Sequence, residues 1–398
     1  MDKKVKTLKI YTIEGNVHSG KTTFLKGMDK EKFSAIWEIK RTEFKNFYII
    51  QFHYIIEEIK RKWKINQGQI NYLDRSYLSL ISYQYFFNKF RNRIIQLFIL
   101  ILVKMNIIIS PDNMFLFVIP YQMTLTYQEM LKEEKGTENL LVSYEYYFFI
   151  VSYFRKILEK GYSTTCQEPF RYSLEGKIRG DILNYLISNS FLKKKKEIPK
   201  ICVDGPSAVG KTTFVSKQIN IKKIYEEEDY LPFSVESPQT QIDFICKRIE
   251  ILSSDAAVII DTSFLSAICY LFYGNTRKVD SNLKIDWILK ISKRVSPIYY
   301  VTSCLYLHDS VEGLYLKRKL DTKRNRANFE KNMEFKDDMD KFFDALDKKM
   351  GKISPIHIVD TKDLTINEKE KKGYHLDNNV LVVDILYAIY CLIKEGKI

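Results

Sequence analysis

The chain has 398 residues, which is more than one ordinary α/β domain contains. Its charged fraction of 28% excludes a disordered chain. Its formal net charge of +14 fits a phosphate-rich partner. The favoured interpretation of this charge is that AT-rich codon usage has added lysines, which are spread over solvated faces. Six scattered cysteines without a C-x-x-C pair disfavour a zinc site and a disulfide framework, and they favour a reducing compartment.

The first half of the chain reads as alternating strands and helices. A short apolar strand is predicted over residues 9–14, and a Gly-rich loop and a helix follow it. Apolar residues at helical spacing predict a second helix over residues 48–59, which leads into a strand ending at Asp74. Another strand is predicted over residues 114–119. Alternation of this kind predicts an α/β fold, with a parallel sheet covered by helices on both faces.

The most apolar segment of the chain is residues 94–109. Its unbroken apolar run, residues 97–103, is far shorter than the roughly 20 residues that span a bilayer. The N-terminus runs into the first strand without an apolar signal region. We therefore expect a buried helix at residues 94–109, and a soluble, cytoplasmic protein without a membrane partner.

The second half repeats the landmarks of the first half in the same order. The matched positions are Lys21 and Lys211, Asp74 and Asp261, Pro111 and Pro297, and Asp181 and Asp384. Strands are predicted at residues 200–204 and 298–307, with a helix over 242–252. Their nearly constant spacing predicts a tandem duplication into domains at residues 1–196 and 197–398, which could form a pseudo-dimer within one chain.

Both halves contain the pattern G-x-x-x-x-G-K-S/T between a strand and a helix. The glycines let the backbone wrap a β-phosphate, and Lys21 and Lys211 can reach the β- and γ-phosphates. The hydroxyl groups of Thr22 and Thr212 can ligate Mg²⁺. The predicted ATP-binding residues are Gly15, Asn16, Val17, His18, Ser19, Gly20, Lys21, Thr22, Thr23, Gly205, Pro206, Ser207, Ala208, Val209, Gly210, Lys211, Thr212 and Thr213.

At these motifs the chain resembles known nucleoside kinases. Residues 13–25 resemble the E-G-N-x-x-x-G-K-S/T opening of the deoxynucleoside kinases, and residues 74–76 resemble the D/E-R-S/H/Y motif of the same superfamily. In the second half, residues 203–206 and 261–270 resemble herpesvirus-type thymidine kinases, and thymidylate kinases share much of this pattern. The resemblance covers the motif skeleton of both halves and implies two tandem P-loop kinase domains.

Phosphoryl transfer needs a carboxylate to accept the proton of the acceptor hydroxyl. Glu38 and Glu228 lie near where the family places this base, although the family's E-P pair is missing. The second half also offers Glu226, Glu227 and Asp229. A solvated surface carboxylate is the competing interpretation for each of them.

Other candidates follow from strand ends and from the resemblance. Asp74 and Asp261 end apolar strands, where a metal-linked or substrate-linked carboxylate belongs. Arg75 could contact phosphate or orient the acceptor, with a structural ion pair as the alternative. The resemblance implies that Gln51, and more weakly Gln241 or Gln239, pairs with the edge of a nucleobase, although a glutamine on an amphipathic helix is usually only a polar position.

The two halves depart from the family pattern at different places. The second half has the arginines expected of a lid over the phosphates, Arg318, Arg324 and Arg326, but has Thr262 where Arg75 stands in the first half. The corresponding segment of the first half, residues 132–135, has only lysines and glutamates. We hypothesise that at least one half has lost efficient turnover.

The favoured function is ATP-dependent phosphorylation of a deoxynucleoside, thymidine or a similar pyrimidine, to its 5′-monophosphate. A nucleoside monophosphate kinase of thymidylate kinase type is the alternative among enzymes. A non-catalytic nucleotide-binding protein that uses its basic surface for nucleic acid or a partner protein is the alternative outside them. Composition and divergence suggest a large DNA virus as the source, which would place the protein in the host cytoplasm or nucleus.

Overall fold

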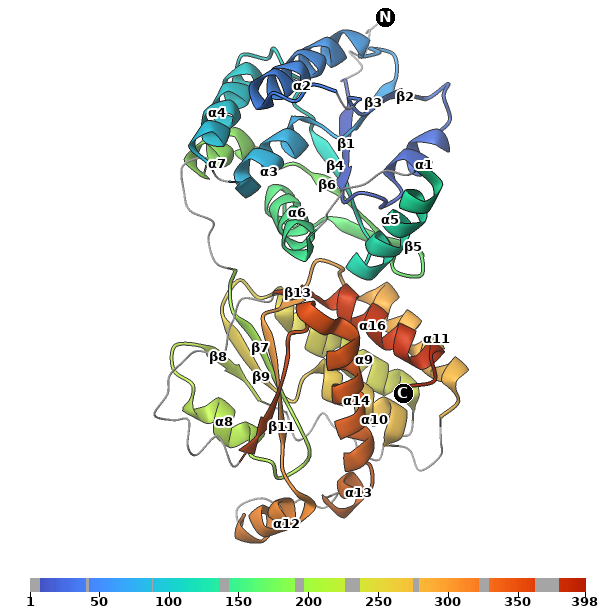
Figure 1. The fold of residues 1–398 in the computed structure, drawn as a ribbon, viewed down its shortest axis with the longest axis vertical. Coiled ribbons are helices and arrows are strands. Elements are labelled where there is room, and N and C mark those ends of the chain that lie inside the picture. The colour runs from blue at the N-terminus through green and yellow to red at the C-terminus, as the bar shows by residue number, and fades with distance from the viewer. Residues whose placement is uncertain are drawn as a thin grey trace, which may run out of the picture. The chain divides into compact units, whose positions relative to one another are not determined.

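The computed structural model describes residues 8–40, 43–87, 89–135, 143–189, 197–225, 237–274, 279–321, 329–361 and 379–398. The chain divides into two compact units, Met1–Lys195 and Lys196–Ile398. Figure 1 draws the first unit in blue to green and the second in yellow-green to red. Each unit is an α/β assembly in its own right.

The first unit is built on a six-stranded mixed sheet with the strand order β2-β3-β1-β4-β6-β5. Its strands are β1 (Ile10–Gly15), β2 (Phe33–Ile36), β3 (Ile70–Asp74), β4 (Asn113–Val118), β5 (Ser163–Glu168) and β6 (Arg171–Lys177). The first four strands pair in parallel, but β6 is antiparallel to both β4 and β5. The prediction of a wholly parallel sheet is therefore wrong for this unit. Pro169 and Phe170 alone connect β5 to β6, and a two-residue link can join only antiparallel strands.

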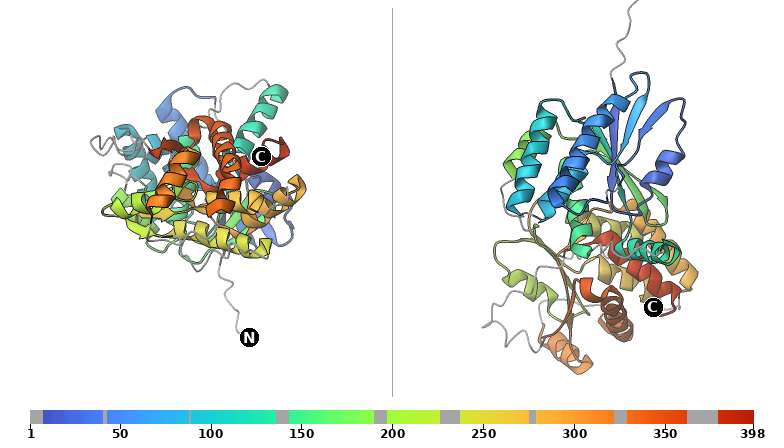
Figure 2. Two further views of the ribbon diagram at one scale, coloured as in Figure 1. Left: turned by 90° about the horizontal axis from the view of Figure 1, so that it is seen from below. Right: turned by 45° about the horizontal axis from the view of Figure 1, so that its top comes forward.

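Helices cover this sheet on both faces. They are α1 (Lys21–Lys26), α2 (Phe47–Arg61), α3 (Tyr77–Phe87), α4 (Phe90–Lys104), α5 (Tyr121–Lys135), α6 (Tyr144–Ile157) and α7 (Ile182–Asn189), with a 3-10 turn at Lys62–Lys64 after α2. In Figure 1 and in the right-hand view of Figure 2, α1 lies on the opposite side of the sheet from α2 and α4. Asn46 starts α2 by accepting hydrogen bonds from the amides of Tyr48 and Ile49.

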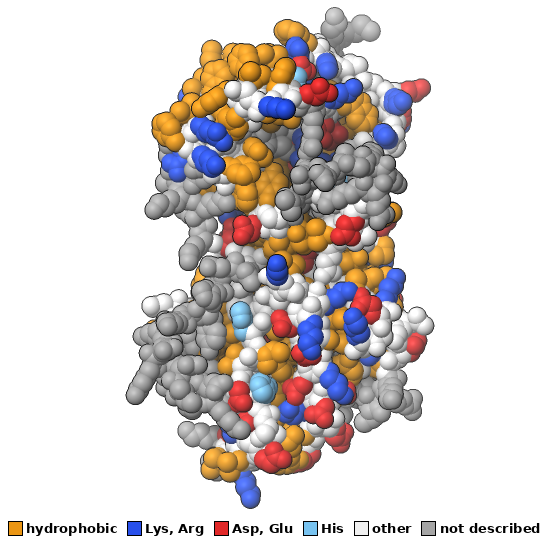
Figure 3. All heavy atoms as spheres, viewed as in Figure 1, with side chains coloured by type: hydrophobic (Ala, Val, Ile, Leu, Met, Phe, Trp, Pro, Cys, Tyr) orange, Lys and Arg blue, Asp and Glu red, His pale blue; other side chains and the backbone are white. Residues whose placement is uncertain are grey.

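Helix α4 corrects the prediction of a buried helix over residues 94–109. It ends at Lys104, and only one face of it is buried, for example at Ile95, Ile99 and Leu102. The opposite face exposes Phe90, Ile94, Phe98 and Ile101, whose exposed fractions are 75, 52, 45 and 53%; Met105, next after the helix, is 63% exposed. Figure 3 shows hydrophobic side chains gathered over α2 and α4. No helix among the described residues is long and apolar enough to cross a bilayer.

The second unit is built on a five-stranded sheet with the order β12-β11-β7-β9-β8, in which all neighbours pair in parallel. Its strands are β7 (Lys200–Asp204), β8 (Lys222–Ile224), β9 (Val258–Asp261), β11 (Ser303–His308) and β12 (Ile356–Asp360). A separate antiparallel pair joins β10 (Tyr300–Val301) to β13 (Val380–Leu381). The predicted parallel sheet is thus present in this unit.

As in the first unit, most helices of the second unit lie in the connections between successive strands. They are α8 (Lys211–Lys217), α9 (Pro238–Glu250), α10 (Phe264–Tyr273), α11 (Ser281–Arg294), α12 (Val311–Leu320), α13 (Phe329–Glu334), α14 (Lys336–Met350) and α16 (Val382–Lys394), with 3-10 turns at Ile251–Ser253 and Gly351–Ile353. The four residues of β9 are all buried, as expected for a central strand covered on both faces.

The hydrophobic core fixes the first helix of each unit against its sheet. In the first unit Phe24 of α1 packs on Phe115 and Phe117 of β4, with ring centroids 5.6 and 5.3 Å away. In the second unit Val215 of α8 shares a buried cluster with Val203 and other apolar side chains of the sheet. Burial of one such side chain contributes about 1.5–3 kcal/mol. This packing holds the loop before each helix in place.

Candidate functional site

The two Gly-rich loops have the same backbone conformation. Positive φ angles recur at matching positions, namely 132° and 142° at Gly15 and Gly205, 62° and 66° at His18 and Ala208, and 94° and 105° at Gly20 and Gly210. Residues that alternate in backbone handedness turn successive N–H groups toward one centre, which makes a concave anion site. All the predicted loop residues lie in these two loops or in the first turn of the helix that follows.

The first glycine of each loop is required by a close approach of two backbones. A Cβ atom on Gly15 would lie 2.3 Å from the carbonyl oxygen of Phe117, and one on Gly205 would lie 2.3 Å from that of Leu307. Any side chain would therefore push the loop away from the adjacent strand, β4 or β11. These contacts explain why the pattern starts with glycine in both halves.

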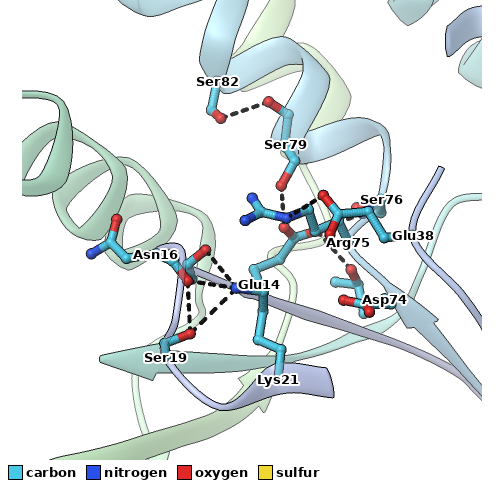
Figure 4. Close-up of polar contacts among 12 residues, drawn as sticks. Glu14, Asn16, Ser19, Lys21, Glu38, Asp74, Arg75, Ser76, Ser79 and Ser82 are labelled. Atoms are coloured by element: carbon cyan, nitrogen blue, oxygen red, sulfur yellow. Dashed lines mark hydrogen bonds and ion pairs between the residues drawn. The ribbon is translucent and has the colours of Figure 1, made fainter. Parts of the chain in front are cut away.

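The loop lysines fold back onto loop carbonyl oxygens. The Nζ of Lys21 donates to the carbonyl oxygens of Asn16 at 2.5 Å and Gly15 at 3.2 Å (Figure 4). Burial, followed by the positive charge of Arg75, lowers the pKa of Lys21 to about 7. The Nζ of Lys211 donates in the same way to the carbonyl oxygen of Gly205 at 2.8 Å. Both Nζ atoms therefore contact carbonyl oxygens of their own loop.

The ends of two strands, β2 and β3, bring charged side chains to the first loop. Glu38 follows β2, and its Oε1 forms an ion pair with Arg75 Nε at 2.8 Å, although the two groups are not aligned as a hydrogen bond. Arg75 follows β3 with a φ of 60°, and its amide donates to the carbonyl oxygen of Ile13 in β1. The charges of Glu38 and Arg75 both act on Lys21. Figure 4 shows these side chains converging on one place.

Asp74, the last residue of β3, lies beside this group. It is buried, and its Oδ1 has no hydrogen-bond partner among the described residues. Burial and then the charge of Glu38 raise the pKa of Asp74, while Lys21 opposes the shift. A buried carboxylate oxygen without a donor fits a site that takes a cation.

A buried carboxylate directly precedes the first glycine of each loop, and the sequence analysis did not predict its role. Glu14 ends its strand fully buried and accepts hydrogen bonds from the amide and hydroxyl of Ser76, from Ser79 and from Thr12. Burial raises its pKa, and these hydrogen bonds oppose the shift. The carboxylate ties the loop strand to the segment that carries Arg75.

Asp204 is the matching carboxylate in the second unit. It accepts hydrogen bonds from the amide of Ser263 at 2.9 Å, from the hydroxyl of Ser263 at 2.6 Å and from the amide of Ser266. Burial raises the pKa of this carboxyl as well. Both halves have an acidic residue directly before the first loop glycine, and a serine two and five residues after the strand aspartate. This repeat could have been found in the sequence.

In the second unit Thr212, a predicted Mg²⁺ ligand, lies beside Asp261, the predicted metal-linked or substrate-linked carboxylate. The hydroxyl of Thr212 donates to Asp261 Oδ2 at 2.6 Å, and the hydroxyl of Thr262 contacts Asp261 Oδ1 at 3.3 Å. In the first unit Thr22 is exposed, and among the described residues no hydrogen bond joins it to Asp74. The described part of the chain contains no cluster of three or more His, Cys, Asp or Glu side chains that could hold a metal alone. One hydroxyl and one carboxylate suit Mg²⁺, which usually completes its shell with water and phosphate oxygens.

The two glutamines differ in their surroundings. Gln51 is buried, and its Oε1 accepts a hydrogen bond at 2.6 Å from Gln84, which in turn accepts one from Asn92. Gln241 has a buried Oε1 without a partner among the described residues. Their predicted contact with a nucleobase stays a prediction.

Two arginines at matching positions donate hydrogen bonds to backbone carbonyl oxygens at the ends of strands. The sequence analysis did not predict them. Arg61 of α2 donates to the carbonyl oxygens of Ile36 at 3.0 Å and Asp74 at 2.9 Å, and it pairs with the buried Glu58 at 2.7 Å. Arg248 of α9 makes a weaker version of this contact, to the carbonyl oxygen of Tyr225 at 3.4 Å.

The predicted lid is described only in part. Arg318 lies partly buried on α12, and among the described residues it makes no hydrogen bond to the second loop. Glu228, Arg324 and Arg326 lie outside the described residues, as do the alternatives Glu226, Glu227 and Asp229. The side chains of residues 132–135 are also outside them.

No family model matches the chain, and no curated protein matches it. Two solved structures of deoxyadenosine kinase from M. mycoides, one with bound dCTP and one with dCMP and dCDP, are both 18% identical to it, with TM-scores of 0.34 and 0.35. Each comparison covers 43% of this chain, and 98 and 97% of the respective kinase.

A gluconokinase from Sinorhizobium meliloti 1021 is 13% identical, with a TM-score of 0.26 over 51% of this chain and 97% of the gluconokinase. These likenesses are too weak to assign a family. The tandem duplication and the viral origin stay predictions.

Proposed function

We propose that the first unit transfers the γ-phosphate of ATP to the 5′-hydroxyl of a deoxynucleoside similar to thymidine, which gives the 5′-monophosphate and ADP. The observation that carries this proposal is the ion pair between Glu38 and Arg75 beside the buried Lys21. A carboxylate, a guanidinium and an ammonium in one place are the groups that phosphoryl transfer to an alcohol requires.

Each group has a role that follows from its position. Glu38 is about half exposed, so an acceptor hydroxyl can reach it and pass its proton to the carboxylate. Arg75 holds Glu38 on one side and can orient the acceptor on the other. Lys21 leaves the loop carbonyl oxygens and binds the transferring phosphate, together with the loop amides.

Mg²⁺ fits both units by the chemistry of the donors present. Thr212 and Asp261 would hold it in the second unit, and Thr22 and the unpartnered Asp74 oxygen would do so in the first. When bound, Mg²⁺ neutralises charge on the phosphates of ATP.

For the second unit a different function is favoured, namely binding of a nucleotide with Mg²⁺ without efficient transfer. Thr262 occupies the place of Arg75 with nearly the same φ, 61°, and its hydroxyl contacts Asp261. A threonine in this conformation is strained and cannot pair with a carboxylate base as an arginine does. The second unit retains the loop and the pair of proposed metal ligands, but it lacks the arginine that would orient the acceptor.

The test is ATP-dependent phosphorylation of a panel of deoxynucleosides and their monophosphates. We expect Glu38→Gln to lower kcat by about 10²–10⁴-fold with little change in ATP affinity, because it removes the proton acceptor and leaves the loop amides and Lys21 in place. Glu57→Gln is the matched control, since Glu57 lies in the same unit and forms an ion pair with Lys60 on the surface of α2.

Full turnover by Glu38→Gln would contradict the proposal. Phosphorylation of monophosphates alone would favour a nucleoside monophosphate kinase. ATP binding without turnover on any acceptor would leave a non-catalytic nucleotide-binding protein.

A further inference from the structure

Arg171, the first residue of β6, has no role in the transfer described above. The antiparallel direction of β6 determines where this residue lies. Tyr172 of β6 pairs with Val118 of β4, and Phe117 of β4 pairs with Gly15, the last residue of β1. The start of β6 is therefore at the edge of the sheet where β1 and β4 end. In a parallel strand the first residue would lie at the opposite edge.

Two of the three guanidinium nitrogens of Arg171 are held by neighbours. Its Nε forms an ion pair with Glu168 Oε2 at 3.1 Å, and its Nη2 donates to the hydroxyl of Tyr127 on α5. The guanidinium carbon also lies 5.4 Å from the centre of the Tyr127 ring. These contacts limit the positions that the side chain can adopt.

The third nitrogen is directed toward the first loop. A Cβ atom on Gly20 would lie 3.9 Å from Arg171 Nη1. This nitrogen has no hydrogen-bond or ion-pair partner among the described residues. Gly20 directly precedes Lys21, so the unpartnered donor is next to the part of the loop that would hold phosphate.

The strand order puts Arg171 and Arg75 on opposite sides of this loop. β3, which carries Arg75, is beside β1 on one side, and β4 and β6 follow on the other. The Glu168 carboxylate is 63% exposed, so breaking its ion pair with Arg171 costs only about 0–1 kcal/mol. A phosphate would offer the guanidinium a stronger, two-point partner.

We propose that Arg171 is a phosphate-binding residue of the first unit, which contacts the phosphate chain of the nucleotide from the side opposite Arg75. Arg171, in the β5–β6 hairpin, supplies a guanidinium group to the first unit. Residues 132–135, the counterpart of the predicted lid, contain no arginine. The inference rests on the proposed function for the identity of the nucleotide, but it concerns binding and not transfer.

The test measures nucleotide affinity in the full-length Lys211→Ala chain, where the first loop is the remaining nucleotide site. A fluorescent ATP analogue is titrated first, and inorganic tripolyphosphate is then used to displace it. We expect Arg171→Gln to weaken ATP and tripolyphosphate alike, by at least about tenfold, and Arg171→Lys to recover part of the loss.

Arg179→Gln is the matched control. Arg179 is also partly exposed, pairs with a neighbouring carboxylate, Asp181, and lies 4.6 Å from a tyrosine ring. It removes the same charge from the same unit, so unchanged affinity in this variant shows that net charge is not the cause. Thermal melting of each variant separates a loss of affinity from a loss of fold.

Unchanged ATP affinity in folded Arg171→Gln would overturn the inference. Weaker ATP binding with unchanged tripolyphosphate binding would also overturn it, because Arg171 would then contact the nucleoside part. A chain whose ATP binding depends on Arg171 but which phosphorylates no acceptor would contradict the proposed function and leave this inference standing.

Discussion

At the scale of single residues, Glu14 and Asp204 each place a carboxylate where water cannot reach it. Serine amides and hydroxyls replace the lost hydration in both cases. Such a group is costly to remove, because each buried donor that loses its acceptor carries its own desolvation cost of about 1–3 kcal/mol. The carboxylates therefore hold each loop strand to the neighbouring strand end.

We predict that Glu14→Ala lowers the free energy of unfolding of the first unit by about 3–5 kcal/mol, and that Asp204→Ala does the same in the second unit. Urea denaturation followed by circular dichroism measures this. Asp181→Ala, which removes an exposed carboxylate, should leave the midpoint unchanged. A loss below about 1 kcal/mol in both buried variants would show that the carboxylates do not hold the strands together.

The pH dependence of nucleotide binding should reflect Lys21. Its pKa is about 7 in the free protein, and phosphate favours its charged form, so binding takes up a proton above that pH. We predict that ATP affinity at the first loop falls as pH rises above about 7, by up to about tenfold per pH unit, and levels off below it. Calorimetry in buffers of different ionisation enthalpy measures the proton uptake.

Lys21→Arg is the control for this titration, because a guanidinium stays charged throughout the range. Its affinity should show only the pH dependence of ATP itself. Equal pH profiles for wild type and Lys21→Arg would mean that Lys21 is already charged in the free protein.

Sequence reasoning found part of this site. It named Glu38 and Arg75 separately, and the structure places them 2.8 Å apart, while their catalytic roles stay predictions. Glu14 is not predicted, because its role depends on hydrogen bonds from Ser76 and Ser79, which lie 62 and 65 residues away in the sequence. The contact between Gln51 and Gln84 depends on the packing of α2 against α3, which no local pattern indicates.

At the scale of elements, the main difference between prediction and structure is the direction of β6, which is antiparallel to β4. Alternating strands and helices predict parallel pairing, and that inference is correct for the second unit and for the first four strands of the first. The short link through Pro169 and Phe170 was the local signal for a hairpin, and Phe170 has a φ of 62° there. Residues 94–109 predict a buried helix because their apolar run is too short to span a bilayer, but apolar content alone does not tell which face of α4 is covered.

We predict that Arg61→Met destabilises the first unit by about 3–5 kcal/mol, because it leaves the Glu58 carboxylate buried without its partner. The double variant Glu58→Leu, Arg61→Met should be more stable than Arg61→Met alone, since the uncompensated charge is gone. Urea titrations of the two single variants and the double variant measure the coupling. A double variant with additive losses would show that the ion pair contributes no coupling energy.

At the scale of the whole molecule, the two units share a loop conformation, a buried carboxylate and a left-handed residue after the strand aspartate. They differ in what surrounds the loop. The first unit has Glu38, Arg75 and Arg171 near it, while the second has Thr262 and a formed pair of Thr212 and Asp261. Because of this difference, the proposal assigns phosphate transfer to the first unit and nucleotide binding to the second.

The most direct measurement is transfer of phosphate from labelled ATP to thymidine by the full-length chain, with Lys21→Ala and Lys211→Ala assayed beside the wild type. We predict that Lys21→Ala abolishes transfer and that Lys211→Ala keeps measurable transfer, because the residues proposed to act on the acceptor, Glu38 and Arg75, lie in the first unit. Transfer that persists in Lys21→Ala and disappears in Lys211→Ala would place the chemistry in the second unit and contradict this assignment.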